Sequence, residues 1–313
     1  MQAKSNKSHE QVELGFGTKS YNKNVRFLNK DGTVNVRRKG LRSYDNIDVY
    51  HWLITTSWTK LLIVILAFYV LVNTLFACIY FALGYEHFGG IEGFTGPDRF
   101  MDLFFFSAQT LTTVGYGHVY PNANHVSTVA AIESLCGLLG FALATGVIYG
   151  RFSRPKAALI YSENVLISPY KEGKGLMFRI ANSKQNELIE IEASVVLSYT
   201  NPETNKREFN VLNLERNKIN FLTLSWTIVH PIDEQSPMYN LTTEELVKRD
   251  AELIILIKAI NDTYSQNVYS RMSYKASDFV DKAKFVPVKQ DSDNDGHILI
   301  NLSDIHKYTP VHN

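Results

Sequence analysis

The sequence predicts a membrane-embedded helical part followed by a C-terminal all-β domain. Two long apolar runs, at residues 61–83 and 125–149, predict two transmembrane helices. The first has 23 residues and no charge, which is enough to cross a bilayer. After residue 156 the chain changes to short apolar or alternating segments separated by turn signals, a pattern typical of an antiparallel β-sandwich. The 313 residues suffice for two such domains.

The stretch between the apolar runs reads Thr-Thr-Val-Gly-Tyr-Gly at residues 112–117. We interpret this motif as an ion-selectivity filter. An ion that enters a medium of low dielectric constant loses on the order of 20 kcal/mol of hydration free energy, so a filter must replace the water shell of the ion with fixed oxygens such as backbone carbonyls. Aiming successive carbonyls at one axis needs backbone angles that residues with a Cβ resist, which explains the two glycines. By itself the motif also fits a hairpin turn. The predicted filter residues are Thr113, Val114, Gly115, Tyr116 and Gly117.

The surroundings of this motif favour the filter. Residues 99–112 are apolar and aromatic-rich without Gly or Pro, and predict a short re-entrant helix. Its carboxyl end would carry about half a negative charge, which favours a cation. Because one chain supplies one filter segment, four chains must surround the ion, and a homotetramer is expected.

Charge predicts the topology. Eight Lys and Arg lie within residues 19–42, whereas residues 85–98 contain none, so both termini are expected in the cytoplasm. No cleavable signal sequence is expected, and the predicted location is a bacterial inner membrane. Residues 44–58 predict an amphipathic helix at the membrane surface, with a soluble packing helix as the alternative. The predicted organisation is an N-terminal arm (1–43), the interfacial helix (44–58), the pore domain (59–152) and the sandwich (153–313).

Four residues of the second apolar run are candidate pore residues. Phe141, Thr145 and Tyr149 share one helical face, so their side chains could close a pore by excluding water. The alternative is that they are packing or lipid-facing residues. Glu133 is an acid inside the membrane, either a hydrogen-bonded brace behind the filter or a cation site in the cavity.

The chain resembles inward-rectifier potassium channels, in particular their prokaryotic (KirBac-type) branch. The resemblance covers nearly the whole chain and rests on the filter together with segments more specific to that family. These are residues 26–36 (RFLNKDGTVNV), 151–155 (RFSRP), 224–239 (LSWTIVHPIDEQSPMY) and 271–278 (RMSYKASD). It implies a tetrameric potassium pore above an immunoglobulin-like cytoplasmic domain.

The resemblance also implies roles for further residues. Tyr149 matches the aromatic gate, and Arg151, Arg154 and Lys156 match contacts to anionic lipid, with plain positive-inside anchoring as the alternative. Glu192 matches an acid that lines the cytoplasmic pore; an exposed strand residue is the alternative.

Two positions depart from the family pattern. Strongly rectifying relatives carry an Asp where this chain has Phe141, which weakens the case for tight block by magnesium or polyamines. Ala157 replaces a basic residue of some animal relatives, so the direction of the lipid effect stays open. Permeant potassium is expected, no cofactor is expected, and Mg²⁺ enters only as a candidate blocker.

Other function classes fit the sequence less well. A potassium-uptake subunit would carry four pore repeats, and a membrane-tethered binding module would have no use for a strained filter. No nucleophile–base arrangement is evident, so an enzyme is not expected, nor is a nucleic-acid partner. His230 has no second metal ligand at useful spacing, and residues 291–296 lack the terminal Glu of a calcium loop.

Overall fold

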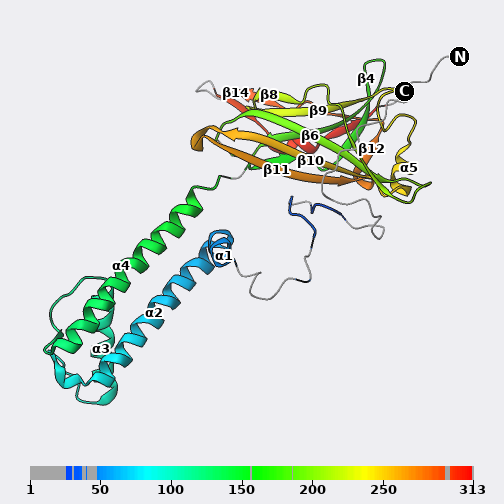
Figure 1. Cartoon of the computed structure of the whole chain (residues 1–313). Helices are drawn as coiled ribbons and strands as arrows, with labels where there is room; N and C mark the ends of the chain where they lie inside the picture. The colour runs from blue at the N-terminus through cyan, green and yellow to red at the C-terminus, as the bar shows by residue number, and fades with distance from the viewer. Residues whose placement is uncertain are drawn as a thin grey trace. The chain divides into compact units, whose positions relative to one another are not determined.

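The structure, a computed structural model, describes residues 26–29, 32–36, 40, 48–155, 157–184, 186–292 and 297–311. The chain forms two compact units, which are both drawn in Figure 1. The membrane unit runs from Gly40 to Arg154, and the β unit combines the chain from Pro155 onward with the N-terminal segment up to Lys39. Of the expected N-terminal arm (1–43), residues 26–29 and 32–36 are described within the β unit.

The membrane unit is built from four helices and a short two-stranded sheet. Its elements are α1 (Val49–Thr55), α2 (Trp58–Leu83), η1 (Tyr85–His87), β1 (Phe88–Gly89), α3 (Gly96–Leu111), β2 (Tyr120–Pro121) and α4 (Asn124–Phe152). α3 packs against both α2 and α4. The packed centre is aromatic: Tyr80 of α2 lies edge-on to Phe88 and to Phe106 of α3. This cluster fixes the short helix between the two long ones.

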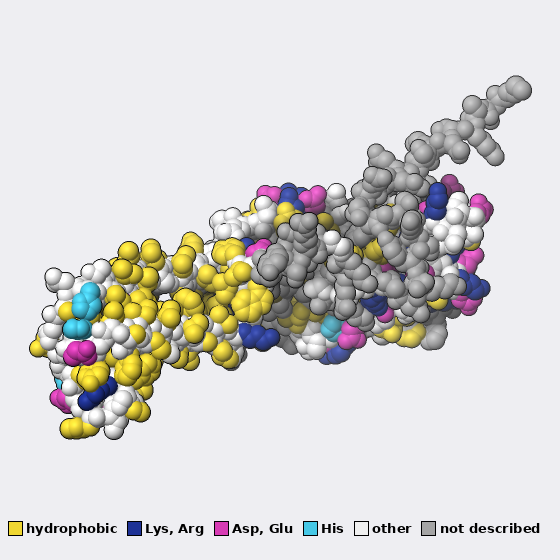
Figure 2. Space-filling view, turned by 60° about the horizontal axis from the view of Figure 1, so that its bottom comes forward, with side chains coloured by type: hydrophobic (Ala, Val, Ile, Leu, Met, Phe, Trp, Pro, Cys, Tyr) yellow, Lys and Arg dark blue, Asp and Glu magenta, His cyan; other side chains and the backbone are white. Residues whose placement is uncertain are grey.

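α2 and α4 are long and apolar enough to cross a membrane. At 1.5 Å per residue their 26 and 29 residues span roughly 39 and 44 Å, more than the 30 Å hydrocarbon layer needs. Few of their side chains are buried within the chain, and Figure 2 shows a broad belt of hydrophobic side chains over this unit. Such a surface needs lipid or neighbouring subunits to cover it.

Two helix boundaries differ from the sequence prediction. α3 begins at Gly96 rather than at residue 99, because Thr95 and Asp98 form a capping box with Pro97 in the first turn. The interfacial helix expected over residues 44–58 is observed as α1, Val49–Thr55, with residues 44–47 outside the described part. It stops because Thr56 is extended and Ser57 caps α2.

The β unit is the predicted β-sandwich, made of two five-stranded sheets; the strand pairs are antiparallel as expected except that β12 pairs with β4 in parallel. In one sheet β11, β10, β6 and β7 are neighbours in that order and β8 also pairs with β6; in the other the order is β12, β4, β5, β3, and β9 also pairs with β5. The first sheet contains β6 (Leu188–Thr200), β7 (Arg207–Val211), β8 (Lys218–Phe221), β10 (Glu252–Asn261) and β11 (Gln266–Lys275). The second contains β3 (Leu159–Tyr161), β4 (Val165–Tyr170), β5 (Gly173–Asn182), β9 (Ser225–Ile232) and β12 (Phe279–Asp281).

Alternating residues of both sheets fill one hydrophobic core. Phe178 of β5, Leu197 of β6 and Ile255 of β10 are among its buried members. A short helix, α5 (Thr243–Lys248), begins at a capping box that Thr242 and Glu245 form. The remaining short elements are η2 (Asp262–Tyr264), η3 (Ala276–Asp278), β13 (Ala283–Phe285), β14 (Gln290–Ser292), β15 (Ile298–Ile300), η4 (Leu302–His306) and β16 (Tyr308–Pro310).

The N-terminal segment docks on the sheet that contains β6, β7 and β10. Phe27 and Leu28 are buried in one cluster with Val196, Phe209 and Ile254. The segment makes a tight turn in which Leu28 bridges to Val34, and Gly32 has φ +78°. It is therefore a small hairpin on the face of the sheet rather than an added edge strand.

A buried carboxylate holds the docked segment. The N–H of Phe27 donates to both oxygens of Glu252, at 3.1 and 3.2 Å, and Glu252 is fully buried. Arg207 lies 3.6 Å from the same carboxylate and 4.8 Å from the centre of the Phe27 ring. A buried carboxylate without partners costs several kcal/mol, so the docked N–H contributes to the stability of the sandwich itself.

Candidate functional site

The filter motif begins where α3 ends. Leu111 is the last residue of α3, and Thr112 caps it with φ −86° and ψ 0°. The N–H of Thr113 donates to the carbonyl of Thr110 at 3.1 Å, and that of Val114 to Gln109 at 2.9 Å. These bonds turn the backbone directly from the helix into the loop, so the negative end of the α3 dipole faces the start of the motif.

Positive φ values recur at every second residue of the motif. They are +59° at Thr113, +57° at Gly115 and +79° at Gly117. Alternating left-handed residues are how a backbone brings successive carbonyls to one side. Two of these positions are glycines, which adopt such angles freely, whereas Thr113 is β-branched and strained there. Strain of this kind concentrates at functional sites.

The loop has little support within its own subunit. The side chains of Val114 and Tyr116 are 52% and 80% exposed. A Cβ added at Gly115 or Gly117 would meet no atom within 4 Å in the described part of the chain. A strained loop with this much open space needs neighbouring subunits on its free sides.

A buried polar network lies where the three helices α2, α3 and α4 meet. Glu133 of α4 is fully buried; one carboxylate oxygen accepts from the Tyr80 hydroxyl at 2.5 Å, and the other bonds the Ser107 hydroxyl. The Ser107 hydroxyl also lies 3.0 Å from the side-chain oxygen of Asn73. Glu133 thus joins α4 to α2 and α3 rather than facing open space.

α4 also touches the end of α3 through a glycine. A Cβ at Gly137 would lie 1.9 Å from the carbonyl oxygen of Leu111, the last residue before the filter. Gly140 and Gly146 have no such neighbour among the described residues. Close packing is therefore a sufficient reason for Gly137.

The three candidate gate residues all lie on exposed parts of α4. Phe141 is 76% and Tyr149 72% exposed, and Thr145 is exposed as well. Within one subunit these side chains are therefore left for a pore, a neighbouring subunit or lipid.

Near its carboxyl end, α4 is tied to α1. Arg151 donates to the carbonyls of Leu53 at 2.8 Å and Thr56 at 2.6 Å, and its guanidinium lies 4.6 Å from the Trp58 ring centre. A Cβ at Gly150 would lie 2.9 Å from the Tyr50 hydroxyl. We call these contacts the α1–α4 joint. Arg151, which the resemblance matches to a lipid contact, therefore donates two hydrogen bonds within its own chain.

Family comparisons agree with this geometry. The transmembrane-domain model of inward rectifier potassium channels matches residues 28–155, and the C-terminal-domain model of the same channels matches residues 159–313. The chain belongs to the inward-rectifier potassium channel family. The channel is 36% identical over 276 residues to inward rectifier potassium channel Kirbac3.1 of Paramagnetospirillum magnetotacticum, which covers 87% of this chain and 92% of that protein.

More distant relatives are also channels. Human inward rectifier potassium channel 4 is 25% identical over 325 residues, covering 90% of this chain and 72% of the human one. An overlay on the alkylpurine DNA glycosylase AlkC of Pseudomonas fluorescens covers 59% of this chain and 48% of that one. It reaches only TM-score 0.21 at 10% identity and carries no argument. The predicted family, the fold class and the non-enzymatic character are confirmed.

Of the other two residues assigned to lipid in this channel, one lies in the described part of the chain. Arg154 is exposed, and Lys156 lies outside the described residues. Neither position separates lipid binding from positive-inside anchoring.

The acid expected in the cytoplasmic pore has basic neighbours. Glu192 is exposed on β6, and its cross-strand partners are Lys258 of β10 and Lys218 of β8. A second acid, Glu190, lies 2.9 Å from Lys218, at a register shift where its φ is +50°. The sequence analysis missed Glu190, because a bulge is not visible in the alternation of residues. Together these two acids and two lysines carry no net charge.

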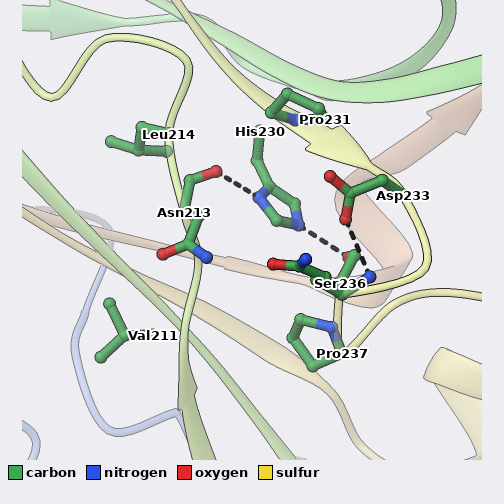
Figure 3. A pocket seen from close by; sticks show the side chains of 9 residues that line it. Val211, Asn213, Leu214, His230, Pro231, Asp233, Ser236 and Pro237 are labelled. Atoms are coloured by element: carbon green, nitrogen blue, oxygen red, sulfur yellow. Dashed lines mark hydrogen bonds between the residues drawn. The ribbon is translucent and has the colours of Figure 1, made fainter. Parts of the chain in front are cut away.

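His230 lies at the edge of a cavity of about 150 Å³ in the β unit. Its Nδ1 lies 2.6 Å from the carbonyl oxygen of Asn213 and its Nε2 2.7 Å from the hydroxyl of Ser236, as Figure 3 shows. Burial lowers the pKa of His230, against smaller opposite effects of the Asn213 bond and the Asp233 charge. Among the described residues no group of three or more His, Cys, Asp or Glu could hold a metal. His230, with a partner at each ring nitrogen, thus fits a structural role.

The lowered pKa makes stability depend on pH. The folded state binds fewer protons at His230 than the unfolded state, so stability should fall as pH drops through the unfolded value near 6.5. We expect His230→Gln, which keeps a donor and an acceptor but cannot gain charge, to reduce this loss. The measurement is the thermal midpoint of the purified tetramer between about pH 8 and about pH 5. His51→Gln on exposed α1 is the control, and equal pH slopes for wild type and His230→Gln would contradict the assignment.

Proposed function

We propose that four copies of the chain surround one axis and conduct potassium selectively through the carbonyls of residues 113–117. The observation that carries this proposal is the alternation of positive φ at Thr113, Gly115 and Gly117. Four α3 carboxyl ends would add negative potential below the filter. The exposed Val114 and Tyr116 side chains would pack against the neighbouring subunits.

The two membrane spans determine which segments lie on each side of the membrane. Because α2 and α4 each cross the membrane, the segment between them lies on the face opposite the sandwich. The basic residues before α1 favour a cytoplasmic location for both termini, and a bacterial inner membrane suits the prokaryotic relative. The partners we propose are three further copies and lipids, with no nucleic acid.

The proposed gate is formed by Phe141, Thr145 and Tyr149. Their exposure on α4 supports a pore-lining position. Bulky apolar rings from four subunits can close a pore by excluding water. Tyr149 is next to Gly150 and close to Arg151, so the α1–α4 joint and the last residue of the proposed gate belong to the same turn of helix.

Glu133 is assigned to bracing the filter rather than to attracting ions in the cavity. Its two hydrogen bonds and complete burial support that role. Anionic lipid is assigned to Arg154 and Lys156, while Arg151 would act mainly in the joint.

The first test is ion flux. In liposomes that hold the purified tetramer, we expect uptake of Rb⁺ in preference to Na⁺. Gly115→Ala should abolish it, because a Cβ at φ +57° costs about 1–2 kcal/mol in each of four subunits and displaces the carbonyls.

Gly96→Ala is the matched control, since a Cβ at Gly96 meets nothing within 4 Å and the residue has no positive φ. Selective flux in wild type and Gly96→Ala, but not in Gly115→Ala, supports the channel. An intact tetramer without flux in any lipid mixture would favour a membrane-tethered binding module.

The role of Arg151 can be separated from its charge. Lysine keeps the charge but cannot bridge two carbonyls with a planar fork. We therefore expect Arg151→Lys to lower the thermal stability of the tetramer and to change flux in neutral and anionic lipid alike. Arg154→Lys, the matched control, should leave both properties unchanged. If Arg151→Lys behaves like wild type, the arginine acts through charge alone and the joint assignment fails.

The charges around the pore predict weak block by internal Mg²⁺. Phe141 offers no charge, and Lys218 and Lys258 offset the acids near Glu192. Phe141→Asp should tighten voltage-dependent Mg²⁺ block at least about tenfold, since it adds four carboxylates. Glu133→Gln should leave block unchanged if Glu133 is a brace. Weaker block in Glu133→Gln would instead place that carboxylate in the cavity.

A further inference from the structure

The segment between the two spans holds a pair of side chains with metal-ligand chemistry. His118 directly follows Gly117, the last filter residue, and Glu92 lies shortly after β1. The Nε2 of His118 and the Oε1 of Glu92 are 3.6 Å apart, and the two side chains are 64% and 82% exposed. Both side chains are therefore open to the solution within the membrane unit.

A rigid backbone frame brings the two residues together. β1 and β2 pair Phe88 with Pro121 and Gly89 with Tyr120. Beyond this pair Gly90 has φ +79°, and a Cβ there would lie 1.8 Å from the carbonyl oxygen of His118. The backbone before Glu92 and that of His118 are thus in direct contact, which only glycine permits.

The other end of this loop is held by α3. The N–H of Gly93 donates to Asp102 at 3.0 Å, and its carbonyl accepts from Arg99 at 3.0 Å. Glu92 therefore lies between two anchored glycines, and its position relative to His118 is set by backbone contacts rather than by the pair itself.

The spacing suits a metal better than a direct bond. At 3.6 Å the two atoms lie within ion-pair distance but are too far apart for a good hydrogen bond. A first-row metal ion with tetrahedral coordination, about 2.1 Å from each of the two donor atoms, would hold these donor atoms about 3.4 Å apart. An imidazole nitrogen with one carboxylate suits Zn²⁺ or Ni²⁺ better than Mg²⁺ or Ca²⁺, which prefer oxygen ligands alone.

We propose that His118 and Glu92 form, in each subunit, a site for a divalent transition metal at the outer end of the filter, and that its occupation inhibits potassium entry. The described residues offer no third ligand of the His, Cys, Asp or Glu types, so water completes the coordination and binding is reversible. Four bound dications around the single outer opening of the filter repel arriving potassium. This inference rests on the proposed function, because the potassium current is the quantity that reports whether the site is occupied.

The experiment is potassium current through the purified tetramer in a planar bilayer, with Zn²⁺ added to one side at a time. We expect inhibition from one side only, reversed by a chelator. His118→Ala and Glu92→Gln should each raise the half-inhibiting concentration at least about tenfold, because even the loss of outer-shell partners of a metal site costs that much. His125→Ala is the control, since His125 is an exposed imidazole in the same unit, 4.8 Å from the His87 ring.

The possible outcomes test the metal site and the proposed conduction separately. An unchanged half-inhibiting concentration in both pair variants overturns the metal site, as does a shift that appears in His125→Ala instead. Absence of current before any Zn²⁺ is added would count against the proposed conduction. Normal metal-free current without Zn²⁺ inhibition counts against the site alone.

Discussion

The rest of the structure depends on the backbone of residues 113–117. Three left-handed residues in alternation, one of them a β-branched Thr, are a conformation that a free loop would leave. Within the subunit, contacts of α4 hold the carboxyl end of α3, where the loop begins. Gly137 packs on the last carbonyl of α3, and Glu133 ties α4 to Tyr80 and Ser107. The front and sides of the loop are left open. Holding the strained backbone is therefore a task shared between one subunit and its neighbours.

This division explains the composition of the membrane unit. Polar groups inside a membrane are costly, yet Asn73, Tyr80, Ser107 and Glu133 are concentrated at one level, where each has a partner. Lipid cannot provide such partners, so the network adds directional contacts to packing that is otherwise apolar. The three helices meet in one arrangement because other arrangements would leave a buried carboxylate unpaired.

The sequence predicted features with strong local signals and missed those that depend on distant partners. The apolar runs and the filter glycines were both recognisable in the sequence. The start of α3 was misplaced although Thr95, Pro97 and Asp98 signalled it. β7 and β9 were not recognised as strands: β7 is short and partly charged, and β9 contains Pro231. The partners of Arg151 lie almost 100 positions away, so its hydrogen bonds to α1 could not be foreseen.

The α1–α4 joint lies at the point where the chain leaves the membrane unit. Arg151 ties α4 to α1, and the peptide bond from Arg154 to Pro155, three residues further on, is the boundary of the unit. Tyr149 lies two positions before Arg151 on α4, so the joint holds the backbone next to the proposed gate residue. A change in the contacts of Arg151 would therefore act first on the turn of helix that carries Tyr149.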